Sequence, residues 1–266
     1  MATFGFIGTG NMGGALARAA CRRVPSDQVF LSNRTAEKAR SLAEELGCRT
    51  ADNQAVAESA DFIFLGVKPQ MMADLLSDIG PILAQRPSRF ILVSMAAGLT
   101  IQRIQELAGG PYPVIRIMPN TPAAIGEGMI LYTCGDGVAP DEEQVFLDAM
   151  AGAGRFSPLA ENLIDAGSAV SGCGPAFLDL FLEALADGGV ACGLPRAQAL
   201  EFAAQMAVGA GRLVLESGSH PGALKDAVCS PGGSTIQGVR ALEVAGFRSA
   251  VMEAVIAAWE KNRALG

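Results

Sequence analysis

Three glycines near the start of the chain have the spacing of a phosphate-binding turn. Gly8, Gly10 and Gly13 follow a short apolar run at residues 3–7 and precede an alanine-rich stretch at residues 15–22. In such a turn the first glycine permits a sharp bend, the second lets a pyrophosphate approach the backbone, and the third lets the helix pack closely on the strand. Free N–H groups and the helix dipole would face the phosphates. The motif predicts dinucleotide binding, and a purely structural turn is the alternative.

Polar residues at the end of the next expected strand, residues 28–32, bear on the choice of cofactor. The ribose of a dinucleotide lies at this strand end, where an NAD-preferring site usually carries Asp or Glu. This chain has Ser32, Asn33 and Arg34 instead. Because arginine is suited to a 2′-phosphate, we expect NADP as the cofactor, with NADPH preferred and NADH possible. The alternative is that Arg34 only opens a solvated helix.

Three later apolar runs, at residues 61–67, 90–95 and 114–118, show little alternation, which is typical of parallel strands covered on both faces. The residues after these strands would meet the same ligand crevice. A surface position is the alternative for Lys68, and a structural turn is the alternative for Asn120. The candidate cofactor-binding residues are Gly8, Thr9, Gly10, Asn11, Met12, Gly13, Ser32, Asn33, Arg34, Asn53, Val67, Lys68, Pro69, Ala96, Ala97 and Asn120.

A second candidate anion site is the glycine-containing loop at residues 220–235, which ends where a helix is expected to begin. Consecutive glycines allow backbone N–H groups to converge on an anion, and a helix N-terminus adds positive potential. Ser234 or Thr235 would also serve as an ordinary helix N-cap. Taken alone, the loop favours capping over chemistry.

Composition excludes several classes of function. The chain has 266 residues and a formal net charge of −7, which disfavours nucleic-acid and anionic-membrane partners. Six cysteines without a CxxC pair and a single histidine cannot form a zinc site of the usual kind, and the cysteines suit a reducing, cytoplasmic compartment. The N-terminal apolar run is too short for a signal peptide. Acidic residues and Pro175 interrupt the apolar stretch at residues 163–190, which we expect to be a buried helix of a soluble protein.

Strands alternate with helices up to about residue 161 and then disappear. The expected fold is therefore α/β, with an N-terminal Rossmann-like doubly wound sheet at residues 1–161 and an all-helical domain at residues 162–266. The expected helices at 163–190, 195–217 and 235–264 are apolar over too much of their circumference for a free-standing bundle. We expect them to pack against a second copy, so that the chain forms a homo-oligomer built from dimers.

Together these motifs resemble the pyrroline-5-carboxylate reductase family. The most specific part is the pattern Pro-Gly-X-Leu-Lys-Asp followed by Ser-Pro-Gly-Gly-Ser-Thr-Ile at residues 221–236. The resemblance extends over essentially the whole chain through shorter segments at residues 6–13, 67–69, 118–122, 171–176 and 193–195. Cys173 departs slightly, because the family often has serine there.

The resemblance implies reduction of 1-pyrroline-5-carboxylate to L-proline by hydride transfer from NAD(P)H, the last step of proline biosynthesis. A protonated imine is already an electrophile, so the enzyme mainly orients ring and cofactor. By resemblance, the Thr235 hydroxyl bonds the ring nitrogen and is the catalytic group, while the residues around Ser230 hold the substrate carboxylate. The implied substrate-binding residues are Val228, Ser230, Gly232, Gly233, Ser234 and Thr235.

Two other functions fit parts of the sequence. A β-hydroxyacid dehydrogenase would need a lysine on the long central helix as acid or base, but no lysine lies between Gly167 and Ala191. A non-catalytic NADP sensor would have no use for a second small-anion site at residues 230–235. The dehydrogenase and the sensor are therefore both disfavoured.

Overall fold

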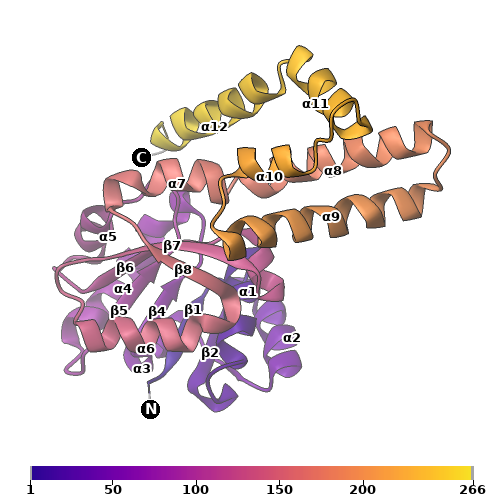
Figure 1. The fold of residues 1–266 in the computed structure, drawn as a ribbon. Helices are drawn as coiled ribbons and strands as arrows, with labels where there is room; N and C mark the ends of the chain where they lie inside the picture. The colour runs from indigo at the N-terminus through magenta and orange to yellow at the C-terminus, as the bar shows by residue number, and fades with distance from the viewer. Residues whose placement is uncertain (1, 265–266) are drawn as a thin grey trace. The chain divides into compact units, whose positions relative to one another are not determined.

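The computed structural model describes residues 2–264 and divides into two compact units. Unit 1 comprises Met1–Cys173 together with Ala258–Gly266, and unit 2 comprises Gly174–Ala257. Unit 1 contains the strands, whereas unit 2 is helical (Figure 1).

An eight-stranded sheet forms the centre of unit 1, in the order β3-β2-β1-β4-β5-β6-β7-β8. The pairs from β3 to β6 are parallel, β7 is antiparallel to β6, and β8 is parallel to β7. The expected doubly wound α/β domain is therefore confirmed. The strands are β1 (Phe4–Ile7), β2 (Val29–Ser32), β3 (Arg49–Thr50), β4 (Phe62–Leu65), β5 (Ile91–Ser94), β6 (Val114–Met118), β7 (Gly128–Cys134) and β8 (Gly154–Pro158).

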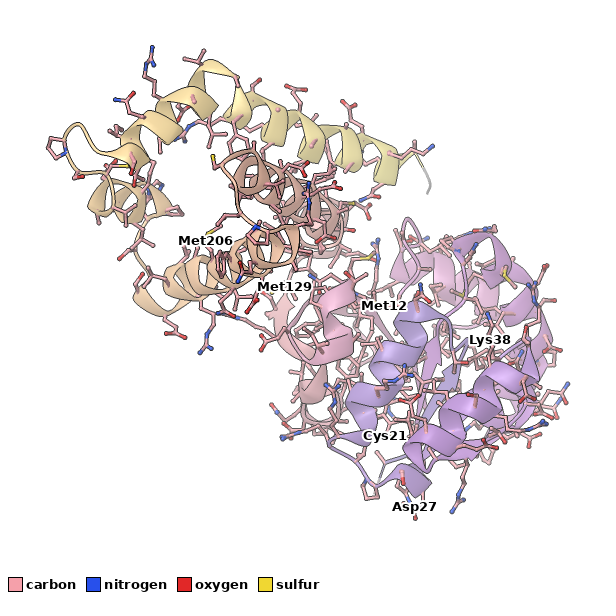
Figure 2. All side chains as sticks on the ribbon, turned by 90° about the vertical axis from the view of Figure 1, so that its right-hand side faces the viewer. Met12, Cys21, Asp27, Lys38, Met129 and Met206 are labelled. Carbon is pink, nitrogen blue, oxygen red and sulfur yellow. The ribbon has the colours of Figure 1, made fainter. Side chains whose placement is uncertain are left out.

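Helices cover both faces of this sheet because the side chains of its central strands are apolar on both faces. Phe6 stacks on Phe64 with ring centroids 4.2 Å apart on the face covered by α1, α2 and α6. Ile7, Ile63 and Leu65 belong to the opposite core, under α3, α4 and α5. The helices are α1 (Asn11–Cys21), α2 (Ala36–Leu46), α3 (Asn53–Ser59), α4 (Met72–Gln85), α5 (Ile101–Ala108), α6 (Pro140–Met150) and α7 (Ile164–Ser171), and Figure 2 labels Met12 and Cys21 near the two ends of α1.

Strand register brings the carboxyl ends of the parallel strands to one edge. Ile7 lies opposite Ser32 on one side and Leu65 on the other. Leu65 lies opposite Ser94, which in turn lies opposite Arg116. The loops after β1, β2, β4, β5 and β6 therefore share this carboxyl edge, where ligands of open parallel sheets bind.

Unit 2 consists of helices joined by short turns. They are α8 (Gly174–Ala191), α9 (Arg196–Ser217), α10 (Pro221–Ala227), α11 (Ser234–Val244) and α12 (Phe247–Arg263). The last turns of α12, from Ala258 on, belong to unit 1. Phe181 of α8 packs on Phe247 of α12, with ring centroids 5.7 Å apart.

Two helices that the sequence predicted as continuous are divided in the structure. The first is split into α7 and α8 at Gly172 and Cys173, whose amide nitrogens both donate to the Ser168 carbonyl. The second is split into α11 and α12 at Gly246, which has φ of +75°. A glycine in the left-handed region ends a helix, so one unbroken helix over residues 235–264 was a wrong prediction.

The expected burial of the helix at residues 163–190 is also wrong for the single chain. By length and composition alone the helical stretch Glu161–Ala191 would suffice to cross a membrane, and only 11% of its most apolar window is buried. Within α8 itself Ala186 is the one buried residue, while Leu180 is 67% exposed. The reason is that unit 2 has too few elements to cover the apolar circumference of α8.

Candidate active site

The three glycines of the β1–α1 turn differ in backbone conformation and in the space around them. Gly8 has φ of +98°, and a Cβ added there would lie 2.5 Å from the Gly66 carbonyl oxygen. A Cβ on Gly13 would lie 2.0 Å from the Gly8 carbonyl oxygen, so the helix can approach the turn only if this residue is glycine. A Cβ on Gly10 would meet nothing within 4 Å. The open space is therefore at Gly10, the position expected to face a pyrophosphate.

The N-terminus of α1 has the features of an anion-binding site. Gly10 caps the helix without a side-chain hydrogen bond, and the first turn contains no acidic residue. The orphan N–H groups of a first helical turn need an acceptor from elsewhere. The N-terminus of α1 therefore suits the phosphates of a dinucleotide.

Gly66 is a residue of this site that the sequence analysis did not single out. It follows β4, and a Cβ there would lie 2.4 Å from the Gly8 carbonyl oxygen. Gly8 and Gly66 thus face each other across adjacent strand ends, and neither accommodates a side chain. Only the adjacency of β1 and β4 reveals this requirement, since 58 positions separate the two residues in the chain.

Asn33 and Thr9 form the link between the glycine turn and β2. Asn33 Oδ1 accepts a hydrogen bond from the Thr9 amide nitrogen at 3.1 Å, and Asn33 Nδ2 donates to the Thr35 carbonyl at 3.1 Å. The Asn33 amide thus braces the turn. Thr9 is 8% exposed, and its Oγ1 has no hydrogen-bond partner among residues 2–264. A buried unsatisfied hydroxyl is costly, and an ordered water or a ligand group would supply the missing partner.

A cavity of about 700 Å³ lies at the end of β2. Its wall includes Ser32, Arg34 and Asn53, three of the residues expected to bind the cofactor, and also Arg40, which is not among them. Ser32 Oγ donates to Asn53 Oδ1 at 2.6 Å, which leaves the Asn53 amide group as a donor. None of the ion pairs among the described residues involves Arg34. Arg40 pairs with Glu37, and Asp52 and Asp78 also line the cavity. Arg34 is therefore the arginine of this cavity that is available to a phosphate on a ribose.

Residues after β4 and β5 complete this carboxyl edge. Pro69 is the first residue of a short 3-10 helix, Pro69–Met71, and Lys68 before it is exposed. Ala96 is buried and Ala97 is partly exposed, in a turn where Gly98 has φ of +77°. Small side chains in this turn leave the backbone open to the approach of a flat ring.

The structure gives Asn120 a bracing role. Its Nδ2 donates to the Ser171 carbonyl at 2.9 Å, and its Oδ1 accepts from the Met129 amide nitrogen at 2.9 Å. Both side-chain atoms are therefore used within the chain, by backbone groups 9 and 51 positions further along it. A turn in which Asn120 bonds its own backbone, the alternative considered above, is absent from the described hydrogen bonds.

In the loop of unit 2 at residues 220–235, the serine and threonine side chains do not cap a helix. His220 Nδ1 accepts from the Gly222 amide nitrogen at 3.0 Å and caps α10, so its role is structural. Gly233, without a side chain, caps α11, and Ser234 and Thr235 are the first two residues of that helix. The capping alternative for Ser234 or Thr235 is therefore wrong. Ser230, Ser234 and Thr235 are all exposed.

Comparison with known proteins extends these observations over the whole chain. A family model described as pyrroline-5-carboxylate reductase dimerisation matches residues 161–265, and one described as NADP oxidoreductase coenzyme F420-dependent matches residues 3–98. Pyrroline-5-carboxylate reductase of Escherichia coli (strain K12) is 42% identical over 264 residues, which cover 98% of this chain and 97% of that protein. The chain belongs to the pyrroline-5-carboxylate reductase family. The corresponding protein of Glycine max is 39% identical over 99% of this chain and 96% of its own length.

Solved structures of the reductase family share the fold. The structure of Plasmodium falciparum pyrroline carboxylate reductase with NADP bound superposes with a TM-score of 0.89 at 32% identity, covering 100% of this chain and 98% of that chain. The structure of the Streptococcus pyogenes reductase gives 0.87 at 30% identity, with 98% of each chain covered. The chain thus has an N-terminal Rossmann-like NADP-binding domain and a C-terminal dimerisation domain.

Proposed function

We propose that this member of the reductase family reduces 1-pyrroline-5-carboxylate to L-proline by hydride transfer from NAD(P)H, the last step of proline biosynthesis. Its relatives of similar length bear the name of that reaction. The observation that carries the proposal is the α11 N-terminus, where Ser234 and Thr235 begin the helix without capping it. The bound NADP in the Plasmodium falciparum structure supports NADP as the cofactor, with NADPH preferred and NADH possible.

The cofactor would be held along the carboxyl edge of unit 1. Ser32, Arg34 and Asn53 would form the site for the ribose phosphate, because all three line one cavity: Arg34 and Asn53 would donate to the phosphate, and Ser32 orients Asn53 through its hydrogen bond to Oδ1. The turn from Gly8 to Gly13, with the buried Thr9 hydroxyl, would bind the pyrophosphate. The rest of the cofactor would be bordered by Val67, Lys68, Pro69, Ala96, Ala97 and Asn120. Asn33 and Asn120 would act indirectly, through the loops that they brace. When bound, the reduced nicotinamide supplies the hydride.

The substrate would be held by the loop before α11. The proposed binding residues are Val228, Ser230, Gly232, Gly233, Ser234 and Thr235. Gly232 has φ of +69°, and the Gly233 amide nitrogen donates to the Ser230 carbonyl at 3.0 Å, which gives the loop a defined turn. The helix N-terminus suits a carboxylate, and the Thr235 hydroxyl would hydrogen-bond the ring nitrogen and move a proton to or from it.

A soluble, cytoplasmic homo-oligomer built from dimers is the proposed form of the protein. The dimerisation model matches residues 161–265, which supports the self-association and a family boundary at residues 161 and 162, whereas the compact units divide later, between Cys173 and Gly174. The exposed leucines of α8 supply the apolar surface that such an assembly would cover. The net charge of −7 is consistent with no nucleic-acid or membrane partner.

Incubation of the purified protein with NADPH and pyrroline-5-carboxylate tests this function. We expect NADPH oxidation with equal formation of proline, measured by absorbance and by amino-acid analysis. The control is the same mixture without substrate. A folded preparation that binds NADPH, as judged by cofactor fluorescence, but forms no proline would overturn the proposal in favour of a cofactor-binding sensor.

A further inference from the structure

A buried ionic network lies at the carboxyl edge of the sheet, beside the proposed cofactor site. Arg116 of β6 is opposite Ser94, the last residue of β5, and only 2% of its side chain is exposed. Its Nη2 lies 3.0 Å from Asp165 Oδ1, and its Nη1 lies 3.4 Å from Glu161 Oε1. The two carboxylates come from the segment that forms and precedes α7. One guanidinium therefore holds this segment at two points.

Glu161 extends the network to the turn after β5. Its Oε1 also accepts from the Ile101 amide nitrogen at 2.6 Å. Ile101 is the first residue of α5 and follows the turn that contains Ala96 and Ala97. The position of this turn, which would border the cofactor, is thus coupled to Arg116 through a single carboxylate.

Asn120 braces the other end of α7. It follows β6 and donates to the carbonyl of Ser171, the last residue of α7, while Arg116 binds Asp165 in the first turn of the same helix. Asn262, also in unit 1, donates to the Asp165 carbonyl at 3.3 Å. Both ends of α7 are therefore held by polar residues of β6 and the loop that follows it.

Stability alone is a poor explanation for this arrangement. A buried ion pair loses much of its Coulomb energy to desolvation, and a well-packed apolar cluster is often equally stable. What a guanidinium provides is directionality, because its planar fork can bind two carboxylates at fixed angles. Arg116 also destabilises the fold in one respect, since its Nε is buried without a hydrogen-bond partner among the described residues.

We propose that Arg116 is a positioning residue for the reductase reaction. It holds the turn at Ala96 and Ala97 and the helix α7 in the geometry that hydride transfer requires, without touching cofactor or substrate. This inference rests on the proposed function, because it assigns the β5–α5 turn to the nicotinamide end of the site. Misplacement of reacting groups by about 1 Å can cost on the order of 100-fold in rate.

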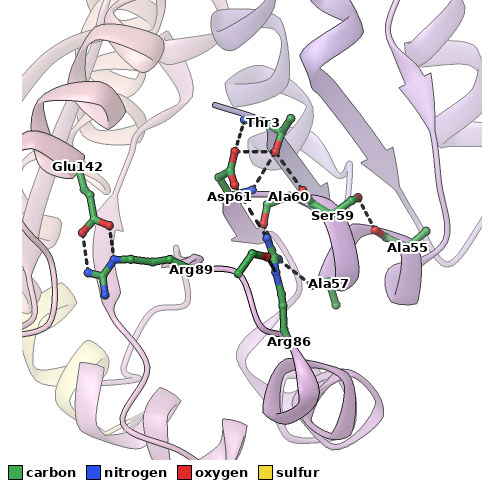
Figure 3. Close-up of polar contacts among 10 residues, drawn as sticks. Thr3, Ala55, Ala57, Ser59, Ala60, Asp61, Arg86, Arg89 and Glu142 are labelled. Atoms are coloured by element: carbon green, nitrogen blue, oxygen red, sulfur yellow. Dashed lines mark hydrogen bonds and ion pairs between the residues drawn. The ribbon is translucent and has the colours of Figure 1, made fainter. Parts of the chain in front are cut away.

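Arg86 offers a matched control at the opposite edge of the same sheet, and Figure 3 shows its polar contacts. Only 3% of its side chain is exposed, and it lies 3.9 Å from Asp61, which precedes β4. It donates to the carbonyls of Ala57 and Ala60 at 2.8 and 2.6 Å. Arg86 is thus equally buried and equally well bonded, but its contacts lie at the amino ends of the strands, where no proposed site residue is found.

The experiment compares Arg116→Lys and Asp165→Asn with Arg86→Lys in the full-length protein. Lysine cannot bind two carboxylates as a fork, so we expect the Arg116 and Asp165 variants to lose about 10-fold or more in kcat. The NADPH dissociation constant, measured by fluorescence, should change by less than about 3-fold because the glycine turn is untouched. Arg86→Lys should lower the melting temperature and keep kcat.

The outcomes separate the inference from the proposed function. A wild-type protein without proline formation would overturn the function itself. With an active wild type, an unchanged kcat in both Arg116→Lys and Asp165→Asn would overturn the positioning role. Equal kcat losses in the Arg86 and Arg116 variants would assign Arg116 to general stability instead. If Arg116→Lys does not fold, Asp165→Asn decides, since it retains the shape of the side chain.

Discussion

At the scale of single residues, the proposed chemistry depends on few side chains. Thr235 is the side chain proposed to move a proton to or from the substrate, and Arg34 is the side chain proposed to make the protein prefer NADPH over NADH. Both are exposed in the isolated chain, so neither contributes much to its stability. Their substitution should therefore change function and leave the fold intact.

Thr235→Ala is expected to lower kcat by about 100-fold, because it removes the hydroxyl that would bond the ring nitrogen. The affinity for NADPH should stay the same, as the glycine turn lies in the other domain. Steady-state kinetics and cofactor titration measure the two effects, and Thr235→Ser, which keeps the hydroxyl, is the control. An unchanged rate for Thr235→Ala would remove this residue from the mechanism.

Arg34→Asp is expected to weaken NADPH relative to NADH by about 1–3 kcal/mol, because it replaces a charge-assisted hydrogen bond with repulsion of the 2′-phosphate. The two dissociation constants measure this directly. Arg103→Asp makes the same change of charge on α5, where Arg103 pairs with Glu106, and should leave the ratio unchanged. Equal weakening of both cofactors by Arg34→Asp would contradict the assignment.

At the scale of elements, the close approach of the β1–α1 turn to the end of β4 shapes the proposed cofactor site. Gly8 and Gly66 approach so closely that neither accepts a Cβ, whereas Gly10 faces open space. The same substitution at these positions should therefore have opposite consequences.

Gly66→Ala is expected to destabilise the fold by about 1–3 kcal/mol, because the added Cβ would lie 2.4 Å from the Gly8 carbonyl oxygen. Gly10→Ala should leave the melting temperature of the cofactor-free protein unchanged and weaken NADPH binding by about 10-fold or more, since the methyl group enters the space for the pyrophosphate. Thermal melts and cofactor titration distinguish the two. A stable Gly66→Ala protein would refute the steric argument.

At the scale of the whole molecule, the helices of unit 2 leave much apolar surface exposed. Leu180 of α8, Leu215 of α9 and Val244 of α11 are each at least 67% exposed. The sequence composition predicted this excess, and the family model for dimerisation covers the same residues. Exposed apolar area of this extent indicates a protein–protein interface.

Leu180→Glu is expected to shift the protein to a lower oligomeric state, because a charge on the apolar face of α8 would be buried against the second copy. Ile125→Glu is the control, since Ile125 is 74% exposed but lies in unit 1. Light scattering coupled to size-exclusion chromatography measures the mass. The same mass for wild type and Leu180→Glu would exclude α8 from the interface.

The elements that could be predicted were those whose sequence signal lies within a short run of neighbouring residues. Apolar runs without alternation identified β1, β4, β5 and β6, and the glycine spacing located the turn before α1. The two-residue strand β3 and the helices α3, α4 and α5 had no such clear local signal and were not predicted. Both helix breaks, at Gly172 and Gly246, were also missed, because a single glycine inside an otherwise helical pattern is frequently tolerated.

By itself, the sequence determined the class of fold, the family and the glycine turn between β1 and α1, since these depend on residue types at short, regular spacings. Only the tertiary structure decided what the polar groups bind. Asn120 braces Ser171, Gly66 faces Gly8, and Arg116 meets carboxylates 45 and 49 positions further along the chain. Such partners are set by the order and register of the strands, which bring together residues whose separation in sequence carries no periodic signal.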